Sequence, residues 1–295
     1  MLGVRSRYRV RVGFQALGAH LILAALAVLC LIPMVLVISA SLSDDKDVAR
    51  YGYQLIPSHI TTFAYEYILK VPAQILNAYA VTAIVTAVGT VMSLTIMSLL
   101  AYTLSRPEFT WRRPLSFFVF FTMLFNGGLV PFYILMTQYL HLQDNLLSLI
   151  LPYLVSPFYV LLLRTYFSEV PRDLLDAARI DGADEWGIFF RIVVPMSTTA
   201  LATVGLFCAL TYWNDWWLAL LFIRKPALEP LQYMLYTILT NIQAMMANPM
   251  STGIRMPLGT VRMAMAVLAA GPAVLAFMLV QRYFISGITI GAIKE

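Results

Sequence analysis

The sequence predicts an all-α polytopic membrane protein with six transmembrane helices and both termini in the cytoplasm. Hydrophobic residues make up 60% of the 295 positions and charged residues only 12%, whereas a soluble domain carries roughly 25% charged residues. Six apolar segments each reach the roughly 20 residues that cross a hydrocarbon core. The Lys and Arg residues between these segments are divided unequally, which predicts the orientation.

The first apolar segment runs from about Leu17 to Ala40, after a tail with four arginines and no acid. A signal peptide begins in the same way, but its apolar core is only about 7–15 residues long. We therefore expect an uncleaved first helix. Five further spans follow, at about Leu76–Leu104, Leu115–Met136, Asn145–Phe167, Thr198–Ile223 and Leu258–Tyr283.

Six spans place both termini on the same side of the membrane. The tails and loops on that side hold thirteen Lys and Arg residues, and the opposite side holds six. Cytoplasmic loops carry the excess of basic residues, so the termini and the loop Pro171–Pro195 are predicted to be cytoplasmic. The loops are too short for a soluble domain, so residues 1–295 are expected to form a single transmembrane domain.

Several function classes are disfavoured. The basic residues flank apolar spans and show no aromatic–basic repeat, so we expect no nucleic-acid partner. Cys30 and Cys208 lie in separate apolar spans, and three isolated histidines have no ligand motif beside them, so no metal or cofactor site is expected in this chain. A GxxxxGK[ST] phosphate loop is absent. Only Asp215 and Arg262 are plausible ionisable groups for coupling within the spans, which is thin support for ion coupling. The energy that drives this protein's work is therefore expected to come from outside the chain.

The loop Pro171–Pro195 is predicted to form two short helices joined by a turn at Gly182. Pro171 suits the first position of a helix, and Gly182 suits the left-handed residue that closes one. Helical spacing places four apolar side chains on one face of the second helix: Trp186, Phe189, Phe190 and Val193. Pro195 is expected to end this helix before the fifth span. Such a loop can dock onto a partner and pass a movement into the membrane.

Two stretches are candidates for a substrate path. Asn126, Gly127, Gly128 and Pro131 should loosen the third span, either to line a cavity or to pack helices closely. The run Tyr212-Trp213-Asn214-Asp215-Trp216-Trp217 offers aromatic faces and hydrogen-bonding groups suited to a saccharide, although the tryptophans equally fit an interfacial belt. Arg262 either pairs with Asp215 or meets acidic sugars.

The segment Leu231–Met246 has the apolar spacing of a helix. We expect it to lie on the outward surface, either as part of the surface that receives a soluble partner or as a plain membrane anchor.

The central loop resembles the EAA signature of the permease subunits of binding-protein-dependent ABC importers. Asp176-Ala177-Ala178, Asp181-Gly182-Ala183, Ile192 and Pro195 stand at the family spacing. Asp176 replaces the usual Glu, and Val194 the usual Leu. The resemblance implies that this loop contacts a cytoplasmic ATPase. The residues expected to couple are Asp176, Ala177, Ala178, Asp181, Gly182, Ala183, Trp186 and Pro195.

The resemblance covers nearly the whole chain and is strongest to the sugar-importer group that is similar to the maltose permease MalG. The Ala101-Tyr102 to Ser105-Arg106 run, the Trp213-Asn214 pair and the Gly287-Ile288-Thr289 tail support it. The run FNGGLVPFY from Phe125 to Tyr133 is similar to the branch that includes permeases for aldouronate and alginate oligosaccharides.

This family implies a type I importer permease fold in the bacterial cytoplasmic (inner) membrane and no catalysis by the chain itself. It also implies a second, MalF-like permease, two ABC ATPase subunits that hold ATP and Mg²⁺, an extracytoplasmic solute-binding protein and an oligosaccharide substrate of acidic type. An ion-coupled secondary transporter and a non-transporting membrane scaffold remain as alternatives.

Overall fold

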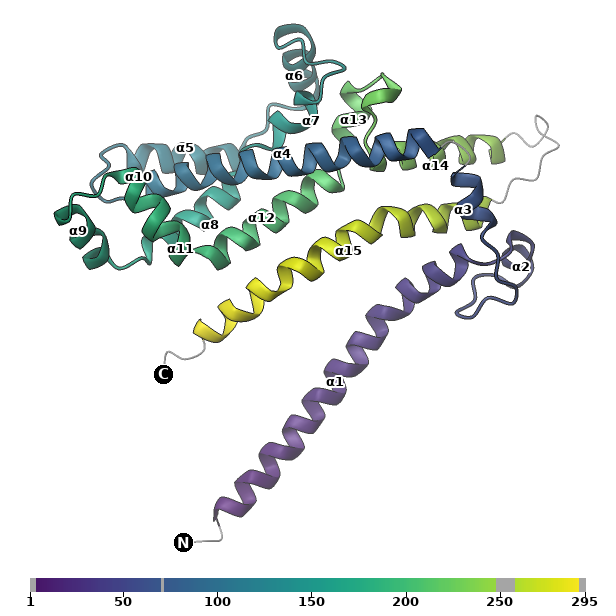
Figure 1. The fold of residues 1–295 in the computed structure, drawn as a ribbon, viewed down its shortest axis with the longest axis horizontal. Helices are drawn as coiled ribbons and strands as arrows, with labels where there is room; N and C mark the ends of the chain where they lie inside the picture. Colours follow the sequence, from purple (N-terminus) through teal and green to yellow (C-terminus); the bar gives the residue numbers. More distant parts are fainter. Residues whose placement is uncertain (1–3, 70–71, 248–257, 292–295) are drawn as a thin grey trace. The chain divides into compact units, whose positions relative to one another are not determined.

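A computed structural model describes residues 4–69, 72–247 and 258–291 (Figure 1). Within these ranges the chain is helical, and its only β pairing is the isolated bridge between Ser43 and Ile60. The chain divides into two compact units, residues 1–71 with 242–270 and residues 72–241 with 271–295. The single domain expected from the sequence remains a prediction.

The first unit begins with the long helix α1 (Val4–Ser41), which contains the predicted first span. Two short helices follow, α2 (Asp45–Tyr51) and α3 (Phe63–Ile68). The Asp44 carboxylate caps α2 by accepting a hydrogen bond from the Lys46 N–H at 2.8 Å. The hydroxyls of Ser41 and Tyr65 lie 2.8 Å apart and join the end of α1 to α3.

The second unit is built around α4 (Pro72–Ser105), which packs against α8 (Pro157–Ser168) and α12 (Thr198–Trp213) (Figure 1). Helix α5 (Arg112–Leu124) packs in turn on α8. At 1.5 Å per residue α4 is ~51 Å long, well beyond the roughly 30 Å of a hydrocarbon core. It therefore provides the axis on which the other segments are placed.

The third predicted span is broken rather than continuous. Helix α5 ends at Leu124, and α6 (Leu129–Ile134) and the π-helical turn Leu135–Tyr139 leave at 110° to it. The Asn126 side chain accepts a hydrogen bond from the Gly128 N–H at 2.9 Å, and Gly128 has φ +86°. A turn of this kind cannot continue a helix, which confirms that the Asn-Gly-Gly run loosens the span.

The fourth predicted span is also bent, by 52°. Helix α7 (Leu147–Ile150) and the 3₁₀ turn Leu151–Tyr153 precede the bend, and α8 follows it. Ser156, the residue before Pro157, is extended at φ −96° and ψ 115°. Proline pushes its preceding residue out of the helical region, so Pro157 begins a new helix instead of continuing the old one.

The fifth predicted span stops at Trp213 and resumes in α13 (Trp217–Phe222). Among the described residues, only Leu17–Ser41 and α4 are long and apolar enough to cross a membrane unbroken, and bent pairs raise the number to at most five. Six continuous spans are therefore not what the structure shows. The reason is that turn-forming residues interrupt apolar segments whose hydropathy alone looks uninterrupted.

Two helices complete the chain. Helix α14 (Leu231–Ala247) confirms the helix predicted from apolar spacing, with Leu231 and Leu235 buried. Its position on the outward surface stays a prediction. Helix α15 (Leu258–Gly291) contains the predicted sixth span and carries Pro272 within it.

Candidate functional site

The loop between the fourth and fifth predicted spans contains the two helices that the sequence predicts. Helix α9 (Arg172–Ile180) is followed by α10 (Glu185–Ile188), the π-helical turn Phe189–Val193 and the short α11 (Val194–Met196). The predicted turn at Gly182 is confirmed, with φ +85°. Pro171 lies one residue earlier than expected, as the cap of α9 rather than its first helical residue.

The turn at Gly182 closes α9 with a Schellman motif. The Gly182 N–H donates to the Arg179 carbonyl at 3.0 Å, and the Ala183 N–H donates to the Ala178 carbonyl at 2.9 Å. Asp184 then caps α10 by accepting from the Gly187 N–H at 2.9 Å. One helix therefore ends and the next begins within four residues, which holds α9 and α10 in a defined relation.

The apolar residues of the second half of the loop are partly buried and partly exposed. Phe189 and Val193 are buried, whereas Trp186 is 60% and Phe190 55% exposed. The exposed pair stacks with ring centroids 6.1 Å apart. Phe190 also contacts Phe189, with ring centroids 4.9 Å apart, so the apolar residues of this segment adjoin one another while only Phe189 and Val193 are covered by the core.

Pro195 does not end its helix. It lies inside α11, and the chain bends by 84° only after Met196, before α12 begins. Proline breaks the i to i−4 hydrogen-bond pattern of an α-helix. The preceding π-helical turn already departs from that pattern, since the Val194 N–H donates to the Phe189 carbonyl five residues back.

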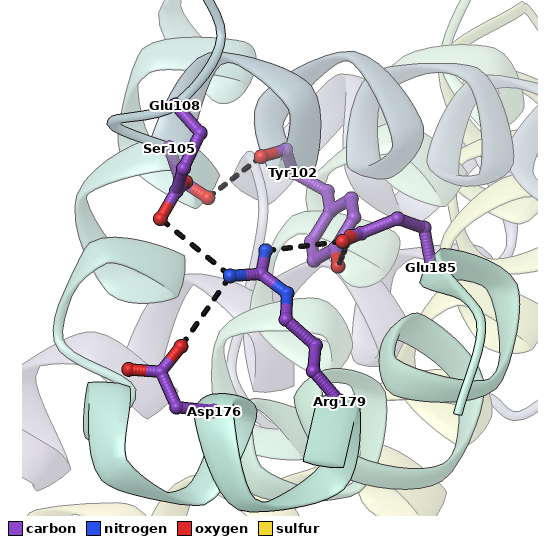
Figure 2. A network of polar contacts seen from close by, with 6 residues as sticks. All are labelled: Tyr102, Ser105, Glu108, Asp176, Arg179 and Glu185. Atoms are coloured by element: carbon purple, nitrogen blue, oxygen red, sulfur yellow. Dashed lines mark hydrogen bonds and ion pairs between the residues drawn. The ribbon is translucent and has the colours of Figure 1, made fainter. Parts of the chain in front are cut away.

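A network of polar side chains ties the loop to the end of α4 (Figure 2). The Tyr102 hydroxyl donates to Glu185 Oε2 at 2.5 Å, and Arg179 Nη2 donates to Glu185 Oε1 at 3.0 Å. Arg179 Nη1 also lies 3.4 Å from Asp176 Oδ1 and 3.6 Å from Glu108 Oε1. Both helices of the loop are thus joined to each other and to α4.

The network sets the charge of its own members. The hydrogen bonds that Glu185 accepts from Tyr102 and Arg179 hold its pKa below the ordinary glutamate value. The hydrogen bond to Glu185 raises the pKa of Arg179. Glu185 and Arg179 are therefore both charged near neutral pH and form a charge-assisted contact.

The predicted coupling residues divide into an exposed set and a packed pair. Ala178 and Ala183 are half-buried and pack on the core of the second unit. The exposed members are Asp176, Ala177, Asp181, Gly182, Trp186 and Pro195. Two apolar residues that the sequence did not single out, Leu174 and Ile180, join them with 46% and 86% exposure.

The anchor residues Tyr102 and Glu185 were also missed. Tyr102 lies in the Ala101-Tyr102 run and Glu185 follows the Asp181-Gly182-Ala183 run closely, but nothing in the sequence pairs positions 83 residues apart.

A cavity of about 620 Å³ forms a second candidate site in the same unit. All three interrupted spans contribute to its wall: Asn126 and Gly128 from the third, Tyr153 from the fourth and Trp217 from the fifth. Irregular backbone at membrane depth is tolerated where it lines a cavity or is buried in protein. The breaks thus converge on one place that combines aromatic, amide and backbone groups.

Asp215 lies behind this wall. Its Oδ1 accepts from the Tyr153 hydroxyl at 2.9 Å, and the backbone N–H groups of Trp217 and Leu218 also donate to its carboxylate. Asp215 therefore caps α13 and holds Tyr153 in the cavity wall. Asn214 is exposed, and its side chain donates to the Leu210 carbonyl at 2.9 Å.

Tyr212 is part of the core instead of the cavity wall. Its hydroxyl lies 2.9 Å from the Ser93 hydroxyl and donates to the Ile150 carbonyl at 3.0 Å. Trp213 is half-buried. Arg262 belongs to the other compact unit, so its pairing with Asp215 stays a prediction. Of the two stretches predicted for the path, the cavity wall includes Asn126, Gly127, Gly128, Pro131 and Trp217.

Within the described part of the chain, no group of three or more His, Cys, Asp or Glu side chains is placed to hold a metal ion.

Comparisons with known proteins agree on one family. Residues 80–290 match the family described as "Binding-protein-dependent transport system inner membrane component". The polygalacturonan/rhamnogalacturonan transport system permease protein YtcP of Bacillus subtilis (strain 168) is 37% identical over 270 residues, which cover 91% of this chain and 94% of the relative. The arabinooligosaccharides transport system permease protein AraQ of Halalkalibacterium halodurans is 30% identical and covers 92% of this chain and 94% of its own.

The fold has a solved counterpart as well. A chain from the crystal structure of a bacterial ABC transporter involved in the import of the acidic polysaccharide alginate superimposes with a TM-score of 0.78. The two chains are 29% identical, and the match covers 92% of this chain and 96% of the other.

Proposed function

We propose that this chain, which belongs to the family of binding-protein-dependent transport system inner membrane components, is the transmembrane permease subunit of an ATP-driven ABC importer for oligosaccharides. The observation that carries the proposal is the anchored loop α9–α10, which presents exposed apolar residues at one end of α4. The chain performs no catalysis and forms half of the translocation path beside a second, MalF-like permease. The membrane is the bacterial cytoplasmic membrane.

The loop is the contact for the ATPase subunits. Leu174, Ile180 and Trp186 are exposed apolar side chains among charged ones, a composition typical of the centre of a protein interface. ATP and Mg²⁺ are held by two ATPase subunits. When these close, the Glu185–Tyr102 hydrogen bond passes the displacement to α4, and the bend at Ser197 passes it to α12.

The cavity between the broken spans is this subunit's part of the sugar path. The ring of Trp217 offers an apolar face to sugar C–H groups, and Asn126 offers an amide to hydroxyls. Helix breaks are also points where segments rotate with little loss of packing, as in transporters with discontinuous helices. The same residues therefore serve binding and movement.

The substrate is proposed to be an acidic oligosaccharide of the uronate type. The names of YtcP and of the alginate importer support this class. The described cavity wall contains no Lys or Arg, so recognition of the carboxylates is assigned to the extracytoplasmic solute-binding protein and the second permease. Arg262 remains the candidate in this chain.

Co-purification from native membranes tests the assembly. Tagged wild-type chain should bring down an ATPase and a second permease, and Ile180→Glu should lose the ATPase because it places a charge in the apolar contact. Thr110→Glu adds the same charge at an exposed position in the turn before α5 and should retain it. Absence of any ATPase with the wild-type chain would contradict the proposal and favour an ion-coupled carrier or a scaffold.

The substrate class is tested separately. The partner solute-binding protein is titrated with oligouronates and with neutral maltodextrins, and tight binding of oligouronates is expected. Preference for maltodextrins would overturn the acidic class and leave the importer assignment intact.

A further inference from the structure

A second pocket, distinct from the sugar cavity, lies beside the coupling loop. It measures about 260 Å³ and is formed by the end of α4 with the following turn, the end of α8 and the helix α9. Five arginines line it: Arg106, Arg112, Arg164, Arg172 and Arg179. Only two acids, Glu108 and Asp176, line it with them. The pocket therefore carries an excess of three positive charges.

The two acids do not neutralise the other arginines. Glu108 and Asp176 both lie against Arg179, which also contacts Glu185. Among the described residues, Arg106, Arg112, Arg164 and Arg172 make no ion pair. Like charges held around a small volume repel one another, so an anion would stabilise this arrangement.

Arg106 shows most directly that a ligand is expected. Its guanidinium lies 4.3 Å above the Tyr102 ring. Its Nε and Nη2 atoms are buried and have no hydrogen-bond partner in the described part of the chain. Buried charged donors without an acceptor are costly and rare. A guanidinium fork is matched in shape by the paired oxygens of a phosphate or carboxylate.

We propose that this basic pocket binds the phosphate group of an anionic phospholipid from the cytoplasmic leaflet. Two exposed aromatic residues lie close to its arginines in the sequence, Trp111 next to Arg112 and Tyr166 two residues after Arg164, with 66% and 45% exposure. Exposed aromatic residues at span ends mark the depth of the lipid headgroups. Basic pockets between helices on the cytoplasmic side are the sites that hold anionic headgroups.

A lipid bound in this pocket would contact the coupling loop. Arg172, Asp176 and Arg179 belong to α9, while Arg106 directly follows α4 and Arg164 lies in α8. A phosphate held between them joins α9 to α4 and α8 in addition to the Glu185–Tyr102 contact. The binding itself does not depend on transport, so its test stands apart from that of the importer assignment.

The experiment is native mass spectrometry of the full purified chain with phosphatidylglycerol and phosphatidylcholine of matched acyl chains. Both lipids carry a phosphodiester, but the quaternary ammonium of phosphatidylcholine is repelled by the arginines, so phosphatidylglycerol is expected to bind about tenfold more tightly. Arg106→Gln should abolish that preference. Arg191→Gln removes an exposed arginine of the same loop that does not line the pocket and should retain it.

Further arms separate the possible anion sources. Competition by inorganic phosphate at millimolar concentration would support the oxyanion site. Should Arg106→Gln fail to fold, as judged by circular dichroism, Arg164→Gln takes its place. Equal binding of both lipids, or a preference that survives both substitutions, overturns the proposal. So does loss of the bound lipid when the ATPase subunits assemble, because the pocket would then hold a protein group.

Discussion

At the scale of single residues, Tyr212 packs its ring against Gly89 and joins two spans. A Cβ at Gly89 would lie 2.6–2.7 Å from three ring atoms of Tyr212. The ring has little freedom to retreat, since its hydroxyl is hydrogen-bonded to Ser93 and Ile150. Glycine is therefore required at this position by close approach of the two helices.

Gly89→Ala should destabilise the protein by about 1–3 kcal/mol through overpacking. Gly205→Ala is the matched control, because its Cβ would meet only Leu94 Cδ2 at 3.5 Å. The control should be neutral or more stable by up to about 1 kcal/mol from helix propensity. Thermal unfolding of both variants in detergent measures the difference, and equal midpoints would show that the contact relaxes freely.

Glu185 predicts a pH dependence of the loop. Its pKa is lower in the folded protein than its ordinary value of 4.5, so the stabilisation is present above that value and is lost as the pH falls through the folded pKa. The wild type and Glu185→Gln should thus differ in melting temperature at pH 7, and the difference should shrink as the pH falls below about 4.5 and vanish below the folded pKa. A difference that does not shrink on acidification would mean that the carboxylate charge is not what stabilises the network.

At the scale of elements, the relation of α9 to α10 depends on a residue in the left-handed region. Nothing lies within 4 Å of a Cβ built at Gly182. A substitution there is strained by φ +85° rather than by lack of space. The effect of a substitution at Gly182 therefore depends on how well the new residue tolerates the left-handed conformation.

Gly182→Val should abolish substrate-stimulated ATP hydrolysis in the assembled importer, because a β-branched residue resists the left-handed conformation and displaces α9 from α10. Gly182→Asn should retain much of the stimulation, since asparagine adopts this conformation most readily after glycine. Membrane insertion of both is checked in parallel. Normal substrate-stimulated ATP hydrolysis in Gly182→Val would show that the turn at Gly182 has no role in coupling.

At the scale of the whole molecule, orientation rests on the distribution of basic residues. Ser58 lies in the loop predicted to be outside and Ile180 in the loop predicted to be cytoplasmic, and both are exposed. With Cys30 and Cys208 replaced by serine, a single new cysteine reports the side of each loop.

Ser58→Cys should react with a membrane-impermeant maleimide in intact spheroplasts, and Ile180→Cys only after permeabilisation. The positive-inside rule predicts this pattern, because it places Ser58 outside and Ile180 in the cytoplasm. The reverse pattern would invert the topology and remove the loop from the reach of an ATPase.

The sequence by itself determined the class of protein, the existence of each apolar segment and the turn at Gly182. These follow from local physics: hydropathy decides which segments enter a bilayer, and glycine alone readily takes the conformation that closes α9. The family spacing around Asp176 indicated the family, which the match of residues 80–290 shows, and the coupling role of the loop stays a prediction.

Only the tertiary structure decided where the spans break together and what anchors the loop. Tyr102 and Glu185 are 83 residues apart, and Asp215 and Tyr153 are 62 apart, so no local pattern pairs them. Packing also decided that Trp186 is exposed and Phe189 is buried. Contacts distant in sequence are set by packing, because a side chain's partner depends on how whole helices meet rather than on its neighbours along the chain.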